Sequence, residues 1–193
     1  MLTARASAAT APRGLLDLYC GVGAPGLLLA ADYATVLGLE QDARAVRLAT
    51  TNAANNAQNH CRYEAGDAAL RLERIADCER GSVWSAIFPA SQTAPHSPPA
   101  EERMAEKDAP AGQIFPSITD ALVDPPRAGL SPRALESLLR IAPELILYIS
   151  CNPATLARDA GQMCKHYKLE ALSAVDLFPH TPHLECVSLW QKK

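Results

Sequence analysis

Residues 14–26 read GLLDLYCGVGAPG, an apolar run that leads into a loop with glycines at positions 21, 23 and 26. The GxGxxG spacing directly after a strand is typical of the first turn of a nucleotide-binding α/β fold. Glycines there permit a tight turn, a close approach of the backbone to a ligand, and close packing of the next helix on the strand. Taken alone the loop is weak evidence, because a glycine-rich turn can be no more than a turn.

A second apolar run, residues 34–40, strengthens the interpretation because it ends in Glu40. A carboxylate about twenty residues after the loop can accept hydrogen bonds from both hydroxyls of a ribose. A third run, residues 61–65, is followed by Asp67, which suits either the amino group of an adenine or the N-cap of the next helix. The pattern predicts a nucleoside cofactor, and it does not distinguish NAD from S-adenosylmethionine.

Strand-like runs alternate with helical patterns along the rest of the chain, which predicts a mainly parallel sheet covered by helices on both faces. The last two runs, residues 169–178 and 183–191, predict an antiparallel hairpin at or near an edge of the sheet. Residues 89–117 are rich in Pro, Ala and Ser without an apolar period, so we expect a low-complexity surface insertion. We expect residues 1–193 to form a single domain with a flexible N-terminus over residues 1–13.

The composition excludes several classes of protein. A hydrophobic content of 48% with 20% charged residues is typical of a globular chain, and no apolar run approaches the roughly 18 residues that a membrane helix needs. A net charge of -3 gives no overall basic surface, so any site for a polyanion must be local.

The six cysteines form no CxxC pair and no secretory signal precedes them, which favours reduced thiols in the cytoplasm. The Arg, Ser and Ala content of residues 1–14 leaves an organelle transit peptide as the alternative.

Residues 147–159, LYISCNPATLARD, place Cys151 where an apolar strand stops. Asn152 is a good N-cap and Pro153 suits the first position of a helix, so a helix is expected to begin beside the cysteine. The dipole of that helix would favour a thiolate, which is the nucleophilic form of cysteine. The alternative is an inert buried thiol at a strand end.

Residues 124–127, Asp-Pro-Pro-Arg, follow another apolar run. The prolines predict an extended turn at the carboxyl end of a strand, where ligands bind in open α/β sheets. Arg127 would then bind a phosphate or Asp124, or form an ordinary salt bridge. His180 and His183 flank a Thr-Pro pair, but two histidines without further ligands do not indicate a metal site.

The chain resembles the catalytic domain of the RNA (uracil-5-)-methyltransferases, from about Gly14 to the C-terminus. This family uses S-adenosylmethionine to make 5-methyluridine in tRNA and ribosomal RNA. The resemblance implies an α/β, Rossmann-like class I methyltransferase fold. It rests on five stretches in the family's order and approximate spacing: LLDLYCGVG, GLEQDARAVRLATTNAANN, ALVDPPRAGL, LYISCNPATLARD and LFPHTPHLECVSLW.

The resemblance also implies roles for individual residues. Cys151 matches the nucleophile, Glu185 matches the base, and Asp124 matches the acid that lies next to the cofactor and the base. The cofactor positions of the family correspond to Asp17, Gly21, Gly23 and Glu40, to which we add Asp67 and Asp124.

The chemistry explains why these residue types are needed. Carbon 5 of uracil is too poor a nucleophile to accept a methyl group until a thiolate adds to carbon 6 and turns the ring into an enolate. Carbon 5 must then lose its proton before the cysteine can leave, and a positioned carboxylate can remove it. The resemblance therefore implies that Cys151 carries out the first step and that Glu185 removes the proton; the alternative for Glu185 is an exposed acid at a strand end.

We expect an RNA substrate, no metal, no membrane contact and a monomeric chain. Family members usually carry a Phe-Gln-Asn stretch and an N-terminal RNA-binding module, whereas thirteen residues precede Gly14 here. Selection of the RNA is therefore expected to lie outside this chain. Two other classes remain open: a non-catalytic module that binds cofactor or RNA, and a different Rossmann enzyme such as an NAD-dependent one. The second of these leaves residues 124–127 and 151–153 unexplained.

Overall fold

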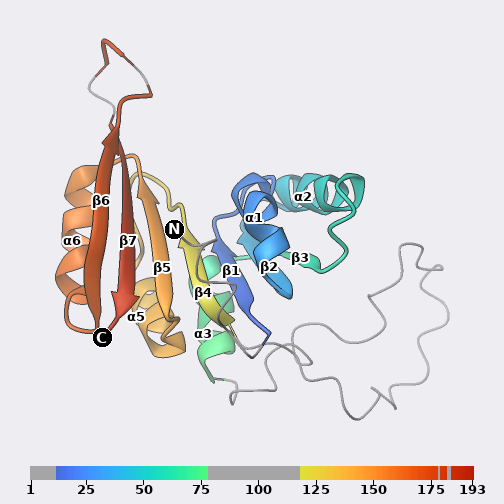
Figure 1. Cartoon of the computed structure of the whole chain (residues 1–193), viewed down its shortest axis with the longest axis horizontal. Helices are drawn as coiled ribbons and strands as arrows, with labels where there is room; N and C mark the ends of the chain where they lie inside the picture. Colours follow the sequence, from blue (N-terminus) through green and yellow to red (C-terminus); the bar gives the residue numbers. More distant parts are fainter. Residues whose placement is uncertain (1–11, 78–117, 178, 182–183) are drawn as a thin grey trace.

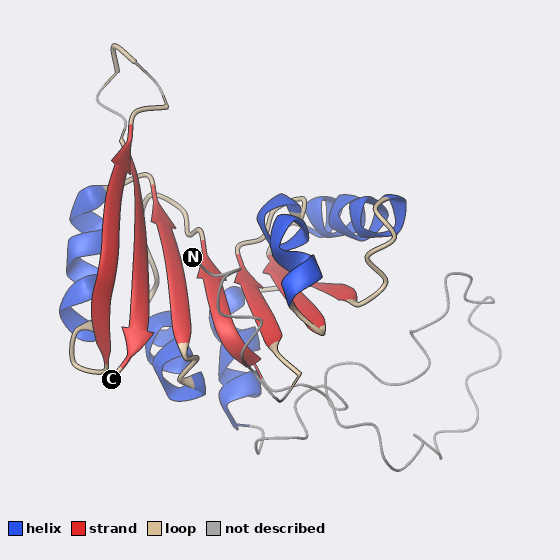
Figure 2. Cartoon of the chain, viewed as in Figure 1, coloured by secondary structure: helices blue, strands red, loops and turns tan. Residues whose placement is uncertain are grey.

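The computed structural model describes residues 12–77, 118–177, 179–181 and 184–193. Seven strands form one sheet in the order β3-β2-β1-β4-β5-β7-β6 (Figures 1 and 2). Strands β1 to β5 pair in parallel, whereas β7 runs antiparallel to both of its neighbours. The expected α/β fold with a mainly parallel sheet is confirmed.

The elements follow the alternation that the sequence predicts. The strands are β1 Gly14–Leu18, β2 Thr35–Glu40, β3 Cys61–Ala65, β4 Ile118–Val123, β5 Leu145–Ser150, β6 Tyr167–Val175 and β7 Glu185–Lys192. The helices are α1 Ala24–Leu29, the short 3₁₀ helix η2 Ala30–Asp32, α2 Ala43–Asn55, α3 Ala68–Asp77, α5 Pro132–Ile141 and α6 Pro153–Met163.

Helix starts are fixed locally by capping residues. The Asp42 side chain accepts from the Arg44 N–H at 2.7 Å before α2, and the Ser131 hydroxyl accepts from the Ala134 N–H at 3.1 Å before α5. Each cap satisfies a backbone donor that the first turn of a helix leaves without an intrahelical partner. A proline also stands in the first turn of both α5 and α6, where its missing N–H costs nothing.

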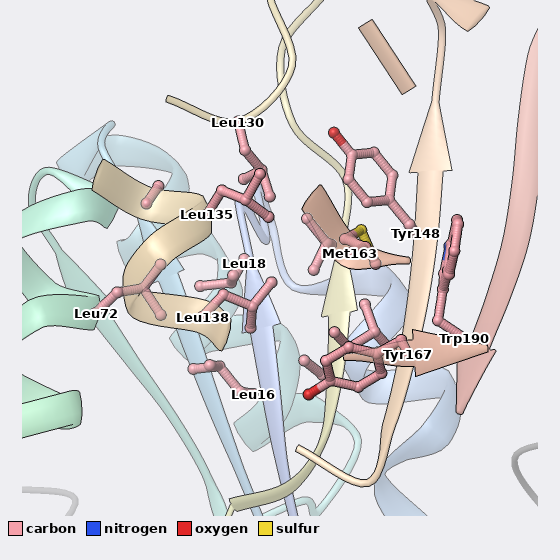
Figure 3. Close-up of a cluster of buried hydrophobic side chains, with 14 of the residues drawn as sticks. Leu16, Leu18, Leu72, Leu130, Leu135, Leu138, Tyr148, Met163, Tyr167 and Trp190 are labelled. Atoms are coloured by element: carbon pink, nitrogen blue, oxygen red, sulfur yellow. The ribbon is translucent and has the colours of Figure 1, made fainter. Parts of the chain in front are cut away.

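Two apolar layers hold the helices on the sheet. The larger layer packs α3, α5 and α6 against one face and includes Leu72, Leu138 and Met163 (Figure 3). The smaller layer lies on the opposite face beneath α1 and α2 and includes Leu15 and Ala53. Strand β1 is buried along its whole length because it lies between these layers, as is usual for the middle of a parallel sheet.

The C-terminal hairpin is present at the edge of the sheet, with β6 and β7 antiparallel. Its second strand, however, lies between β5 and β6, so β7 pairs with β5 over six residues, from Leu145–Gln191 to Ser150–Cys186. The start of β7 consequently meets the carboxyl end of β5. This pairing decides which side chains share the site.

Of the expected flexible N-terminus, residues 1–11 lie outside the described residues, whereas Arg13 does not fit the expectation. Its side chain is buried, forms an ion pair with Asp120 and lies over the ring of Tyr33 at 5.4 Å from the centroid. The cause is that Asp120 is itself buried within β4 and requires a positive partner. The expected insertion over residues 89–117 lies outside the described residues. No helix within the described ranges is long and apolar enough to cross a membrane.

Candidate active site

The carboxyl ends of the parallel strands bring the predicted residues to one edge of the sheet. In strand order this edge carries Asp67 after β3, Glu40 at the end of β2, the glycine loop after β1, Asp124 after β4 and Cys151 after β5. This is the edge at which open α/β sheets bind their ligands, and the strand order reverses between β1 and β4, the point at which such ligands usually bind.

The glycine loop is held by the carboxylate of Glu40. The Gly21 N–H donates to Oε2 of Glu40 at 3.1 Å, and the Asp42 N–H donates to Oε1 at 2.9 Å. Gly21 and Gly23 have φ angles of 54° and 81°, which lie in the left-handed region that glycine adopts without strain. Glu40 therefore fixes the loop to the end of β2, and each of its oxygens keeps a further lone pair for a ligand.

Asp17 is a buried acid below the loop, with 1% of its surface exposed. Burial raises its pKa from 3.8 to about 7, an effect opposed by the N–H of Gly26 and reinforced by the charge of Asp124. The Gly26 N–H donates to Oδ2 at 3.1 Å, and a Cβ on Gly26 would lie 2.5 Å from that oxygen. The third glycine of the loop is thus needed for the close contact between α1 and Asp17.

Asp67 acts as a helix cap. Its Oδ1 accepts from the Leu70 N–H at 2.9 Å at the start of α3. This confirms the capping interpretation of the sequence. The binding of an adenine amino group stays a prediction, for which Oδ2 is the remaining oxygen.

Cys151 lies between the end of β5 and the start of α6, as the sequence predicts. The N-cap of α6 is Asn152, whose Oδ1 accepts from the Ala154 N–H at 3.1 Å. The thiol is free and half-buried, whereas the cysteines at positions 20, 61 and 186 are buried. Among the described cysteines, only Cys151 and Cys164 are therefore partly or fully open to solvent.

Glu185 joins this edge through the pairing of β7 with β5. The last pair of that ladder is Ser150–Cys186, and Cys151 and Glu185 are the chain neighbours of this pair at the same end of the ladder. Asp124 is close enough to Glu185 for the two charges to interact: partial burial raises the pKa of Asp124, and the charge of Glu185 raises it further. The three residues proposed for catalysis thus gather from β4, β5 and β7.

The turn after Asp124 is tied to α6. The carbonyl oxygen of Arg127 accepts from Nδ2 of Asn152 at 3.0 Å and from the Thr155 hydroxyl at 3.4 Å. The Arg127 guanidinium forms no ion pair with another described residue, and its binding of a phosphate stays a prediction. Among the described residues no cluster of three or more His, Cys, Asp or Glu could hold a metal, and His183 lies outside them.

Two residues at this edge are not predicted by the sequence reasoning. Tyr19 follows β1 with a φ of 60°, an uncommon conformation for a bulky residue, and its pKa is raised by burial and by the charges of Asp67, Asp159 and Glu40. Asp159 is a buried carboxylate on the inner side of α6. Its spacing from the apolar residues Leu156 and Met163 is the signal that marks it as inward-facing.

Comparison with known proteins agrees with this arrangement. The family model of the tRNA (uracil-5-)-methyltransferases matches residues 115–193. The chain is 36% identical over 178 residues to an uncharacterized RNA methyltransferase of Nitratidesulfovibrio vulgaris, covering 92% of this chain and 31% of that protein. It is 37% identical over 183 residues to the 23S rRNA (uracil(1939)-C(5))-methyltransferase of Acidithiobacillus ferrooxidans, covering 92% of this chain and 32% of the relative. The chain thus spans about a third of the length of the curated relatives it matches.

A solved structure shows the same fold. The tRNA (uracil-54, C5)-methyltransferase of Pyrococcus abyssi, in complex with S-adenosyl-L-homocysteine, superposes with a TM-score of 0.62 at 27% identity, covering 98% of this chain and 36% of that one. On sequence and fold together, the chain is similar to the RNA (uracil-5-)-methyltransferases over a region that makes up about a third of their length.

Proposed function

We propose that the chain catalyses methylation of carbon 5 of a uridine in RNA, with S-adenosylmethionine as methyl donor and a covalent bond between Cys151 and the uracil. The observation that carries the proposal is the convergence of Cys151, Glu185 and Asp124 at the carboxyl edge of the sheet, from three separate strands. A buried structural cysteine would need neither a carboxylate beside it nor a helix start.

The residues next to the glycine loop suit S-adenosylmethionine. Glu40 retains acceptor capacity for a ribose diol after holding the loop, and Asp67 retains one oxygen for an adenine amino group. Asp17 is a buried acid that has no positive partner among the described residues, so a cationic amino group would complement it. The bound cofactor supplies an electrophilic methyl group on a sulfonium. The complex of the Pyrococcus abyssi enzyme with S-adenosyl-L-homocysteine is consistent with this choice.

The chain's own residues account for the remaining steps. The Cys151 thiolate forms a bond to carbon 6 of the uracil, which places electron density on carbon 5. Carbon 5 then takes the methyl group, after which the Glu185 carboxylate accepts the proton of carbon 5 and the bond from carbon 6 to sulfur breaks. Asp124, whose pKa is raised by burial and by Glu185, is suited to hold the edge of the base.

A trapping experiment tests the proposal. RNA that contains 5-fluorouridine has no proton on carbon 5 to lose, so the reaction stops at the methylated covalent intermediate. We expect the wild-type chain, incubated with such RNA and S-adenosylmethionine, to form an adduct that survives denaturing electrophoresis. tRNA and 23S rRNA fragments are the substrates to use, because the relatives named above act on these RNA classes.

A matched pair of cysteine variants provides the control. Cys164 is an exposed free thiol at the C-terminal end of α6, whereas Cys151 stands at its N-terminal end. Cys151→Ala should abolish the adduct and Cys164→Ala should leave it unchanged. An adduct that persists in Cys151→Ala would refute the assignment. Binding of the cofactor without an adduct, even when the N-terminal part of a relative is added, would favour a non-catalytic module.

A further inference from the structure

The carboxylate of Asp159 lies outside the set of residues that the proposed reaction uses, yet it is buried at 1% exposure and fully bonded. Its Oδ2 accepts from the Tyr148 hydroxyl at 2.7 Å and from the Leu130 N–H at 3.0 Å. Its Oδ1 accepts from the neighbouring Arg158 guanidinium at 2.8 and 2.7 Å. Burial of a charged carboxylate costs free energy unless hydrogen bonds compensate for the lost water. A carboxylate with four such bonds holds the groups that donate them in fixed positions.

The bonds of Asp159 join the two segments that carry the catalytic residues. The segment 124–130 begins with Asp124 and ends with Leu130, whose N–H bonds to Asp159 and whose carbonyl oxygen accepts from Nη2 of Arg158 at 2.8 Å. Helix α6 begins directly after Cys151 and carries both of these partners. The end of the segment is thereby attached to the helix through both its backbone donor and its backbone acceptor.

Close packing reinforces the attachment. Gly129 has a φ of 73°, and a Cβ there would lie 2.7 Å from Nη2 of Arg158 and 2.9 Å from Oδ2 of Asp159. The Tyr148 hydroxyl adds β5 to the connection, and Figure 3 shows Leu130 and Tyr148 at the same end of the apolar cluster. The segment, β5 and α6 therefore meet at one carboxylate.

We infer that Asp159 is a positioning residue. It holds the segment 124–130 against α6 and so sets the position of Asp124 relative to Cys151. The inference rests on the proposed function, in which these two residues act on one uracil. Asp159 itself touches neither of them in the structure. Its effect on the reaction is geometric, and a displacement of about 1 Å is enough to slow an aligned reaction by up to about a hundredfold.

The fold contains a matched cluster for comparison. Asp120 is also a buried carboxylate that accepts from a tyrosine hydroxyl, that of Tyr33, at 2.8 Å, and from an arginine, Arg13. This cluster lies towards the amino-terminal ends of the strands, away from the catalytic edge. Tyr33→Phe and Tyr148→Phe therefore remove the same hydrogen bond at the two ends of the sheet.

The experiment compares these two variants with wild type and with Asp159→Asn. We expect both phenylalanine variants to lower the melting temperature by a similar amount, about 2–8 °C. With saturating S-adenosylmethionine and 5-fluorouridine RNA, Tyr148→Phe should slow adduct formation about tenfold and Asp159→Asn by up to about a hundredfold. Tyr33→Phe should retain the wild-type rate, and calorimetric affinity for S-adenosylmethionine should stay within about twofold in all four proteins.

A second measurement does not depend on activity. Hydrogen–deuterium exchange should speed up about tenfold or more across residues 127–131 in Tyr148→Phe and Asp159→Asn, and stay unchanged there in Tyr33→Phe. Equal slowing of the adduct in the two phenylalanine variants, or unchanged exchange in residues 127–131, would overturn the inference. If wild type forms no adduct at all, the proposed function fails, and the exchange data alone then decide whether Asp159 holds the segment to α6.

Discussion

Replacement of Asp17 by asparagine is expected to stabilise the protein at neutral pH. Asp17 is buried at the end of β1, and its carboxylate has one hydrogen-bond donor, the Gly26 N–H, and no positive partner among the described residues. Asparagine has the same shape, and its Oδ1 can still accept from Gly26. The substitution therefore removes the buried charge and keeps the hydrogen bond.

The magnitude follows from the pKa of Asp17, which burial raises from 3.8 to about 7. Between these values the folded protein binds the proton more tightly than the unfolded chain, so stability is lost as pH rises through this window. Each pH unit corresponds to 1.36 kcal/mol, which gives a total loss of about 4 kcal/mol by pH 8. Asp17→Asn escapes this loss because its side chain does not titrate.

Urea denaturation of both proteins at pH 4, 5, 6, 7 and 8 measures the effect. The free energies of unfolding should nearly coincide at pH 4 and should diverge by about 1 kcal/mol per pH unit, with the variant more stable by about 4 kcal/mol at pH 8. Asp120→Asn serves as the contrast, because it removes the partner of the buried Arg13 and should destabilise the protein.

Asp17→Asn should also weaken binding of S-adenosylmethionine about tenfold or more, because it removes the carboxylate proposed to bind the amino group of the cofactor. Gain of stability with loss of binding is the usual behaviour of a buried charge kept for function. A stability difference between Asp17→Asn and wild type that stays constant from pH 4 to 8 would refute the reasoning, since it would mean that Asp17 does not titrate in this window.

Two further predictions concern catalysis and the glycine loop. Cys151→Ala should abolish both methylation and adduct formation, whereas Glu185→Gln should slow turnover about a hundredfold or more and accumulate a methylated adduct on ordinary uridine RNA, visible by denaturing electrophoresis. Full turnover in Glu185→Gln would show that another group removes the proton. Gly23→Ala should lose about 1–3 kcal/mol of stability by urea denaturation, because φ is 81° and the new Cβ would lie 2.8 Å from the Tyr63 hydroxyl. Its control, Gly161→Ala in α6, has nothing within 4 Å of the new Cβ and should gain up to about 1 kcal/mol. Equal effects of the two alanines would contradict this argument.

The sequence by itself determined the elements and the edge at which the site forms. Alternation of apolar runs and helical patterns predicts the parallel sheet, and Asn152 with Pro153 predicts the start of α6, because caps act within a few residues of each other along the chain. The carboxyl ends of parallel strands all lie on one edge. Glu40, Asp124 and Cys151 could therefore be assigned to a common edge before the structure was known.

The tertiary structure alone decided which of these groups meet. Glu185 and Cys151 come to the same end of the β5–β7 ladder because β7 inserts between β5 and β6, and the local sequence of a hairpin does not state which of its strands joins the sheet. Likewise the pKa of Asp17 is raised, and Asp159 connects two segments, only because residues distant along the chain bury these side chains. The spacing of residues along the chain fixes the geometry within one helix or strand. Sheet order, strand register and burial arise instead from contacts between elements. These contacts set the charges of the site residues and the distances between them.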